Sequence, residues 1–300
     1  AVGGGSAIDT AKGIAIGAAN PGTDIWEFWK NKKELKTALP VGTVLTISAA
    51  GSEMSNSAVL TDEETQDKSG IGSDLIRPKF AIMNPELTYT IPKYQLTCGI
   101  VDIFMHTIER YFTPVHGNEL TDEIAEGLLR TLIRNAAKAY ENQEDYDAMS
   151  EIMWCGSISH NGITGLGRPK DFLCHKLGHQ LSAKFDEAHG ATLSAVWGSW
   201  ARYVYHLDEA RFANYGRKVW NIDEKNDEKT AVAAIERTEE FFRSLHMPTC
   251  LGDMKMGIQP DEVLKEMAGK ATAGDTMKVG AFQKMGEKEL YEIYKKANHR

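Results

Sequence analysis

Hydrophobic and polar positions follow two different patterns along the chain, and the pattern changes near residue 92. The first part alternates short β-branched or apolar runs, typical of buried strands, with a segment of helical period. The predicted elements are a helix at 7–19, strands at 41–48 and 79–83, and a hairpin of 57–61 with 68–72. Strands that alternate with helices indicate an α/β layer with a parallel sheet.

Beyond residue 92 the apolar positions recur with the 3.6-residue period of helices, and no convincing strand follows. The predicted helical segments are 96–111, 122–140, 145–159, 172–183, 191–205, 209–220 and 228–245, with a further helix opening at Pro260. We therefore predict two domains, an α/β dinucleotide-binding layer at 1–92 and an all-helical domain at 93–300. Because a glycine turn follows directly on Ala1 and Val2, we expect part of the α/β domain to lie upstream of this sequence.

Composition excludes several classes of partner. The chain has 300 residues, of which 42% are hydrophobic and 25% charged, with a net charge of -8. Nucleic acid as a partner is disfavoured because neutralising phosphates needs a basic face. No apolar stretch reaches the roughly 20 residues of a membrane-spanning helix. The four scattered cysteines are typical of reduced thiols, which predicts a cytoplasmic protein.

Two clusters of residues have the chemistry of metal ligands. Asp102 and His106 are four residues apart in an apolar helical run, so both project from one helix face. His175 and His179 have the same spacing, and His189 follows shortly afterwards. One carboxylate with two or three imidazoles suits Fe(II) or Zn(II), and a catalytic ion keeps one position open for substrate.

Each member of these clusters has a simpler interpretation when taken alone. Asp102 and His106 fit a buried pair that only satisfies its own hydrogen bonds, and His189 fits a residue at a helix start. We favour the metal site because it explains all of them at once. A helical zinc peptidase is excluded, since Lys176 stands where its catalytic Glu belongs. The remaining histidines have no comparable partners and are interpreted as structural or solvent-exposed: His116, His160, His206, His246 and His299.

Two turns of small residues predict a nucleotide site. Gly3, Gly4 and Gly5 lie between an apolar strand end and a helix, where glycines let the backbone approach a pyrophosphate at a helix N-terminus. A plain tight turn is the alternative for this segment alone. A second such turn, 48–53, follows the next strand. Two of them at one sheet edge favour a nucleotide.

These motifs together resemble the iron-containing (group III) alcohol dehydrogenases, most closely their butanol dehydrogenase-like branch. The resemblance covers essentially the whole chain and rests on several short segments. They are Gly3-Gly4-Gly5-Ser6 with Asp9 and Lys12, Gly51-Ser52-Glu53, Gly99 with Asp102 and His106, and the pair His175 and His189. It implies a dehydroquinate synthase-like architecture, with an α/β nucleotide domain joined to a helical metal domain and the active site between them.

The resemblance also implies roles for individual residues. Fe(II), or Zn(II) in some members, is expected on Asp102, His106, His175 and His189. His179 is expected to line the substrate pocket. A pKa near neutrality would let it relay a proton there, a role that a cofactor ribose hydroxyl or a chain of waters would serve equally. The NAD or NADP contacts are expected at Gly4, Gly5, Ser6, Asp9, Thr46, Ser55, Lys68 and Leu87. Lys68, near a phosphate region, favours NADP. Family members form homodimers or larger homo-oligomers, which is expected here too.

The resulting hypothesis is a metal-dependent alcohol dehydrogenase or aldehyde reductase that transfers a hydride between NAD(P) and a small primary alcohol or aldehyde, as for butanol and butanal. The alternatives are a dehydroquinate synthase-like lyase and an inactive metal-binding fragment. Aromatic residues expected around the site favour a small apolar alcohol over a polyanionic substrate: Phe104, Phe172, Trp197 and Trp200.

Overall fold

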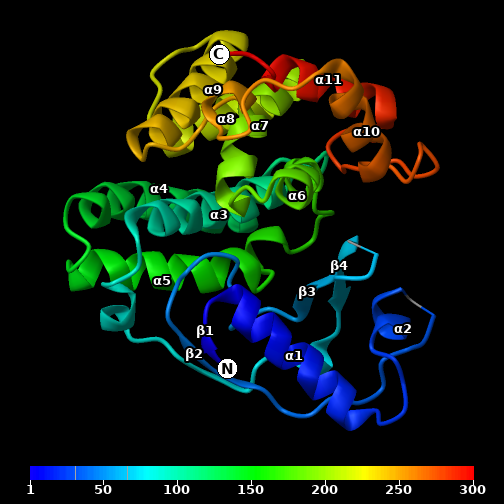
Figure 1. The fold of residues 1–300 in the computed structure, drawn as a ribbon. Coiled ribbons are helices and arrows are strands. Elements are labelled where there is room, and N and C mark those ends of the chain that lie inside the picture. Colours follow the sequence, from blue (N-terminus) through cyan, green and yellow to red (C-terminus); the bar gives the residue numbers. More distant parts are fainter. Residues whose placement is uncertain (31, 66) are drawn as a thin grey trace.

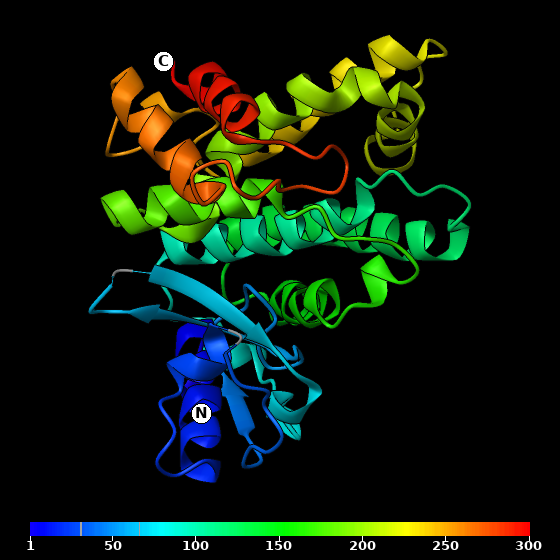
Figure 2. The same cartoon turned by 90° about the vertical axis from the view of Figure 1, so that its right-hand side faces the viewer.

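The fold is arranged in three tiers (Figures 1 and 2). A computed structural model describes residues 1–30, 32–65 and 67–300. The α/β layer of residues 1–92 forms one end, the helices of residues 93–185 cross the middle, and those of 189–297 form the other end. The N-terminus lies in the layer and the C-terminus at the opposite end.

The layer holds a three-stranded parallel sheet and a separate antiparallel hairpin, as predicted. In the sheet the strand order is β1-β2-β5, with Val44 of the middle strand paired to Val2 and Ile82. The elements are β1 (Val2–Gly3), α1 (Gly5–Ala19), α2 (Trp26–Trp29), β2 (Gly42–Leu45), β3 (Ser57–Asp62), β4 (Asp67–Gly72), η1 (Asp74–Ile76), β5 (Phe80–Ile82) and η2 (Pro85–Thr88). Strand β2 is shorter than the predicted 41–48, because the chain leaves the sheet after Leu45 to contact the middle tier.

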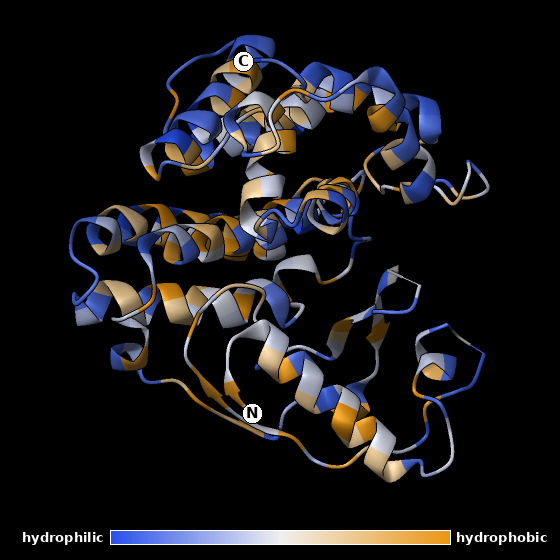
Figure 3. Cartoon of the chain, in the orientation of Figure 1, coloured by the Kyte–Doolittle hydropathy of each residue, from blue (hydrophilic) through white to orange (hydrophobic). Residues whose placement is uncertain are grey.

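The apolar core of the layer is small. One group of five buried side chains gathers around Phe28 and Trp29, and a second joins Ile8 and Leu45 to one residue of the middle tier. Large apolar side chains also remain on the surface of the layer, among them Phe80, which is 61% exposed. In Figure 3 the strands are mostly hydrophobic, while the loops around them are mixed.

The second part of the chain is helical, as predicted, and among the described residues beyond 92 it has only an isolated bridge between Val279 and Met285. Its helices are α3 (Lys93–Tyr111), α4 (Glu119–Glu141), α5 (Tyr146–His160), η3 (Ile163–Gly165), α6 (Leu173–Phe185), α7 (His189–Val204), η4 (Tyr205–Leu207), α8 (Glu209–Trp220), α9 (Asp227–Ser244), η5 (Leu251–Asp253), α10 (Asp261–Ala271) and α11 (Glu287–Ala297). None of the described helices combines the length and apolar character that crossing a bilayer demands.

Helix α3 is the centre of this region. Every residue from Leu96 to Tyr111 is buried, because helices α4, α5 and α7 pack around it. The surrounding apolar side chains form one continuous core that reaches α11. Polar groups on α3 are therefore held in a water-poor interior, where unpaired ones are costly.

Candidate metal and cofactor site

Asp102 and His106 project from the same face of buried helix α3. The Nδ1 atom of His106 lies 2.9 Å from the backbone carbonyl oxygen of Asp102 and 2.9 Å from its Oδ1 atom. A carbonyl oxygen only accepts, so the bond requires the imidazole proton on Nδ1. The Nε2 atom of His106 then carries the lone pair that a metal ligand needs.

The N-terminus of α6 presents His175 to the same point. Its Nδ1 donates to Glu109 of α3, and the other oxygen of Glu109 accepts the backbone N–H of Cys174 at 2.6 Å. This carboxylate fixes the tautomer of His175, as carboxylates behind metal-binding imidazoles commonly do. The Nε2 atom of His175 is left buried without a hydrogen-bond partner among the described residues.

His189, the first residue of α7, completes the cluster. Ligand atoms of Asp102, His175 and His189 all lie within 4.8 Å of one another. The Asp102 Oδ1 atom is 3.6 Å from Nε2 of His175 and 3.9 Å from Nε2 of His189, and among the described residues it accepts no hydrogen bond of regular geometry, although His106 Nδ1 is 2.9 Å away. His106 lies beside this group, with its ring centre 4.3 Å from that of His175. Unpartnered buried oxygen and nitrogen atoms that converge in this way fit a divalent ion.

The ionised Asp102 and the neutral His106 and His189 suit a cation, whereas His175 has to release a proton before it can bind one. Burial opposes ionisation of the Asp102 carboxyl, but His106, His175 and His189 outweigh it and hold its pKa well below its usual range. Burial lowers the pKa of His106, and it lowers that of His189 to about 3. For His175 burial acts in the same direction, but Glu109 and Asp102 prevail and raise its pKa to about 9.

Three glycines bring the elements of the site into backbone contact. A Cβ at Gly99 of α3 would overlap the carbonyl oxygen of Ser48, which follows β2. A Cβ at Gly190 of α7 would overlap the backbone of Cys98 on α3. At Gly178 of α6, it would lie 2.7 Å from Thr192 Oγ1 on α7. Glycine permits these approaches, so α7 and α3 meet through main-chain contact at Gly190, α3 meets the segment after β2 in the same way at Gly99, and α6 approaches side chains of α7 closely at Gly178.

The predicted cofactor turn opens helix α1 at the edge of the sheet. Gly4 precedes the helix, and a Cβ there would overlap the side chain of Ile47, whereas nothing crowds the corresponding position at Gly5. Ser6 lies in the first turn and is exposed. Thr46 follows β2 and is half-buried, with its N–H bonded to the Gly3 carbonyl. Free N–H groups at this helix start suit a phosphate.

Lys12 of α1 is fully buried and links this helix to residues 52–57 by hydrogen bonds. Its ammonium donates to the carbonyl oxygens of Ser52 (2.8 Å) and Ser57 (2.7 Å) and to hydroxyls of Ser52 and Ser55. Asp9 accepts from the Ser52 hydroxyl and from the Val59 N–H. We call Lys12, Asp9, Ser52, Ser55 and Ser57 the Lys12 knot. The structure thus places Asp9 and Ser55, two predicted cofactor residues, inside it.

The last two predicted cofactor residues lie on exposed segments. Leu87 of η2 is 41% exposed. Lys68 of β4 is also exposed, and its charge helps lower the pKa of His179 and His189. Burial raises the pKa of Asp9, and the charge of Lys68 opposes that rise. The hairpin therefore extends a cation from the layer toward the metal cluster.

Two family models match the chain. The model described as "Iron-containing alcohol dehydrogenase" matches residues 1–85, and that described as "Fe-containing alcohol dehydrogenase family, C-terminal" matches residues 97–298. The chain belongs to the iron-containing alcohol dehydrogenase family. The boundary between the two matches lies near the predicted domain boundary at residue 92.

Individual members of the iron-containing alcohol dehydrogenases are similar to this chain over most of its length. NADH-dependent butanol dehydrogenase A of Clostridium acetobutylicum is 38% identical over 299 residues, 99% of this chain and 76% of that protein. NADPH-dependent aldehyde reductase YqhD of Escherichia coli is 40% identical over 255 residues, 84% of this chain and 66% of that protein. The crystal structure of NADH-dependent butanol dehydrogenase A from Thermotoga maritima has a TM-score of 0.93 and 33% identity, covering 99% of this chain and 75% of that one.

The site residues predicted from the sequence did not include Glu109, although its spacing from Asp102 and His106 pointed to it. Glu109 stands seven residues after Asp102 and three after His106, on the same helix face. A third ionisable residue on the same face of a buried helix indicates a side chain that interacts with the metal ligands. His160 was also misjudged: its Nε2 lies 3.1 Å from Ser57 Oγ and its ring packs against that of His106.

The expectation that four aromatic residues surround the site is wrong for three of them. Phe104 and Trp197 pack against Phe242 in the helical core, and Trp200 packs there against other aromatic rings. They are buried because they fill the interior between helices. Only Phe172 contacts the site, with its ring centre 4.8 Å from that of His175. Its backbone has φ of 51°, a conformation that strains a non-glycine residue and often marks functional sites.

His179 lies one turn beyond His175 and is stacked on His189, with ring centres 5.0 Å apart. Burial, followed by the neighbouring His189 and His175, lowers its pKa well below its usual range. The side chain is therefore neutral at pH 7.

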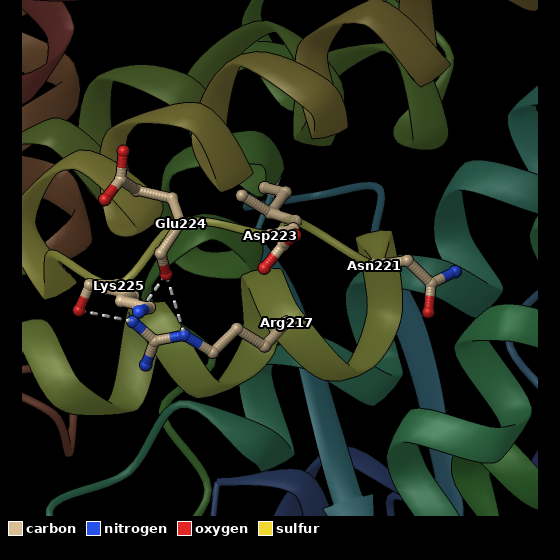
Figure 4. A pocket seen from close by; sticks show the side chains of 6 residues that line it. Arg217, Asn221, Asp223, Glu224 and Lys225 are labelled. Carbon is tan, nitrogen blue, oxygen red and sulfur yellow. Dashed lines mark hydrogen bonds between the residues drawn. The ribbon is translucent and has the colours of Figure 1, made fainter.

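A hollow elsewhere on the molecule offers no competing site (Figure 4). It follows the C-terminal end of α8 and is lined by Arg217 and residues 221–225. Arg217 donates to the carbonyl oxygens of Glu224 and Lys225 and pairs with Asp227. Its cation is thus used to close the loop, and the hollow contains no converging unpartnered groups.

Proposed function

We propose that this chain is a metal-dependent alcohol dehydrogenase or aldehyde reductase that uses NAD(P) to interconvert a small primary alcohol and its aldehyde, as with butanol and butanal. The observation that carries the proposal is the convergence of Asp102, His175 and His189, in which Asp102 Oδ1 and His175 Nε2 are buried and without a hydrogen bond among the described residues. The butanol dehydrogenases and the aldehyde reductase among the relatives support the substrate class.

The residues proposed to hold the ion are Asp102, His106, His175 and His189, with Fe(II) or Zn(II) as the metal. When bound, the metal supplies Lewis acidity toward the alcohol or aldehyde oxygen, and the nicotinamide supplies the hydride acceptor or donor. Glu109 keeps the His175 lone pair directed at the cluster. Asp102 contributes the negative charge that balances the ion.

The layer is proposed to bind the cofactor. Gly4, Gly5 and Ser6 at the start of α1 offer backbone N–H groups to a pyrophosphate. Thr46 and Leu87 are proposed to contact the cofactor, while Asp9 and Ser55 shape the site through the Lys12 knot. Lys68 is also proposed to contact the cofactor, and its charge helps lower the pKa of His189 in the metal cluster.

His179 is proposed as the residue that accepts the proton released from the alcohol. Its imidazole is neutral, half-buried and stacked on His189, which places it beside the open side of the cluster. A pH profile of kcat that is identical in wild type and His179→Ala would disprove this role.

Metal binding tests the proposal first. The purified chain is titrated anaerobically with Fe(II) and Zn(II) beside His175→Ala, with His116→Ala as the matched control, since His116 is 65% exposed. We expect one ion per chain, bound by wild type and control and lost in His175→Ala. Absence of binding by folded wild-type protein would overturn the proposal.

Turnover separates the remaining hypotheses. We expect reduction of butanal with NADPH or NADH, and comparison of kcat/KM for the two establishes the preferred cofactor. Metal binding without any hydride transfer would indicate the inactive metal-binding protein, while turnover of a polyanionic substrate without net oxidation would indicate the lyase. We also propose a cytoplasmic homodimer or larger homo-oligomer, to be tested by light scattering; the four free, buried cysteines support a reducing compartment.

A further inference from the structure

His160, the last residue of α5, touches both parts of the proposed active site. Its Nε2 atom lies 3.1 Å from the hydroxyl of Ser57, the first residue of β3 in the layer. On the other side its ring centre lies 4.4 Å from that of His106, with the ring planes inclined by 56°. Figure 1 shows α5 between the layer and helices α3 and α4, so its end is suited to join them.

Close contacts hold the layer against this end of α5. Gly51 has φ of 62°, and a Cβ there would lie 2.5 Å from the carbonyl oxygen of Gly156 and 2.7 Å from the Cβ of His160. The buried Ser157 hydroxyl donates to Glu53 of the same layer turn. The spacing between that turn and His160 is thus fixed by backbone packing.

Ser57 is in turn a member of the Lys12 knot. Its carbonyl oxygen accepts from Lys12, and its hydroxyl lies 3.3 Å from that of Ser55. Lys12 belongs to α1, the helix whose N-terminus is proposed to meet the cofactor phosphates. A continuous series of contacts therefore runs from the cofactor helix through Ser57 and His160 to the ring of His106.

We propose that His160 is a positioning residue that couples the two binding sites, so that metal and cofactor each strengthen the binding of the other. When either ligand binds, it restricts the motion of the residues in this series of contacts. The second ligand then pays a smaller cost in conformational entropy, which produces positive cooperativity without a large movement. Such coupling is reciprocal by thermodynamic linkage. The inference rests on the proposed function, because it takes His106 as a metal ligand and α1 as the cofactor helix.

The test measures the Kd of NADPH by fluorescence in metal-free and in Co(II)-loaded protein, and the Co(II) affinity by its visible absorption. We expect the wild-type Kd of NADPH to fall by about 5-fold to 150-fold when Co(II) is bound. The ratio of the NADPH Kd without Co(II) to that with Co(II) measures the coupling. It should fall to about 2-fold or less in Ser57→Ala, which removes one hydroxyl, and in His160→Phe, which keeps a ring against His106. His160→Gln, which keeps a hydrogen-bonding group toward Ser57, should retain part of it.

His116→Phe serves as the matched control and should keep the wild-type ratio, because His116 is exposed and pairs with Asp208. Circular dichroism confirms that each variant is folded. A wild-type ratio of one, or wild-type ratios in folded Ser57→Ala and His160→Phe, would overturn the coupling while leaving the proposed function intact. Wild-type protein that binds no Co(II) would instead overturn the proposed function and this inference with it.

Discussion

Lys12 in the layer and Asp102 in the helical region are both charged and buried, yet their surroundings differ. Lys12 is held by hydrogen bonds to three serines, Ser52, Ser55 and Ser57, and the apolar groups of the layer around it are small. Asp102 lies inside a continuous apolar core, with an oxygen left unpartnered. The metal ligands are therefore positioned by packing, whereas the nucleotide turns are positioned by polar contacts. The two halves should respond to different perturbations.

Removing apolar volume from the helical core should have the largest effect. Phe104 is fully buried against Phe241 and Phe242, so Phe104→Ala should lower the free energy of unfolding by about 3–5 kcal/mol. Urea denaturation measures it. Ile14 on the layer surface is 66% exposed, and Ile14→Ala should change stability by about 0.5 kcal/mol or less. An equal loss of unfolding free energy in the two variants would contradict the expected difference between the helical core and the surface of the layer.

Breaking the Lys12 knot should weaken the layer specifically. Lys12→Met deprives buried oxygens of Ser52, Ser55 and Ser57 of their donor, at an expected cost of about 2–4 kcal/mol. Hydrogen exchange should accelerate in β3 and remain unchanged in α3. Equal acceleration in α3 would mean that the two regions unfold as one unit.

Metal should stabilise the helical region. An ion at 100 times its Kd should raise the free energy of unfolding by about 2.7 kcal/mol, and His175→Ala should abolish the increase. Since Glu109 and Asp102 raise the pKa of His175 to about 9, binding at pH 7 displaces a proton. Metal affinity should consequently rise between pH 6 and 9, as calorimetry can measure. A flat profile would contradict the assigned proton on His175.

The smallest expected effect is a change of the free energy of unfolding with pH that comes from Lys12 in the layer. Burial lowers the pKa of Lys12 to about 8, from 10.5 in the unfolded chain. The unfolded state then binds more protons between pH 8 and 10.5, so stability gains from this group as pH rises, by about 1 kcal/mol from pH 8 to 9. The difference between wild type and Lys12→Met across this range isolates the effect. A difference that shrinks as pH rises would refute the lowered pKa.

Local patterns predicted most of the fold. The long 3.6-residue periods located α3 to α10, although α11 was not predicted, and the hairpin was found from its two short runs. Strand β2 was predicted too long because Thr46, Ile47 and Ser48 have strand-like composition but serve to reach α3. That contact depends on Gly99, about fifty residues away, and no local pattern contains it.

The candidate site was predictable where its members share a helix or follow one another closely in sequence, as His175 and His189 do. Asp102 and His106 are marked by their spacing, and Glu109 on the same face could have been found in this way. His160 could not, because its partner Ser57 is 103 residues distant in sequence. Likewise, nothing in the sequence distinguishes Phe172 at the site from Phe104 in the core, since both are aromatic residues in apolar surroundings.

The close contacts at Gly99, Gly178 and Gly190 have a consequence for engineering. Because these positions have no room for a Cβ, the distances among the ligand-bearing helices cannot be retuned by substituting them. A variant library that seeks a different metal or substrate should keep all three glycines constant. Diversity is better directed at Phe172 and His179, whose side chains border the cluster without setting the spacing of its backbone.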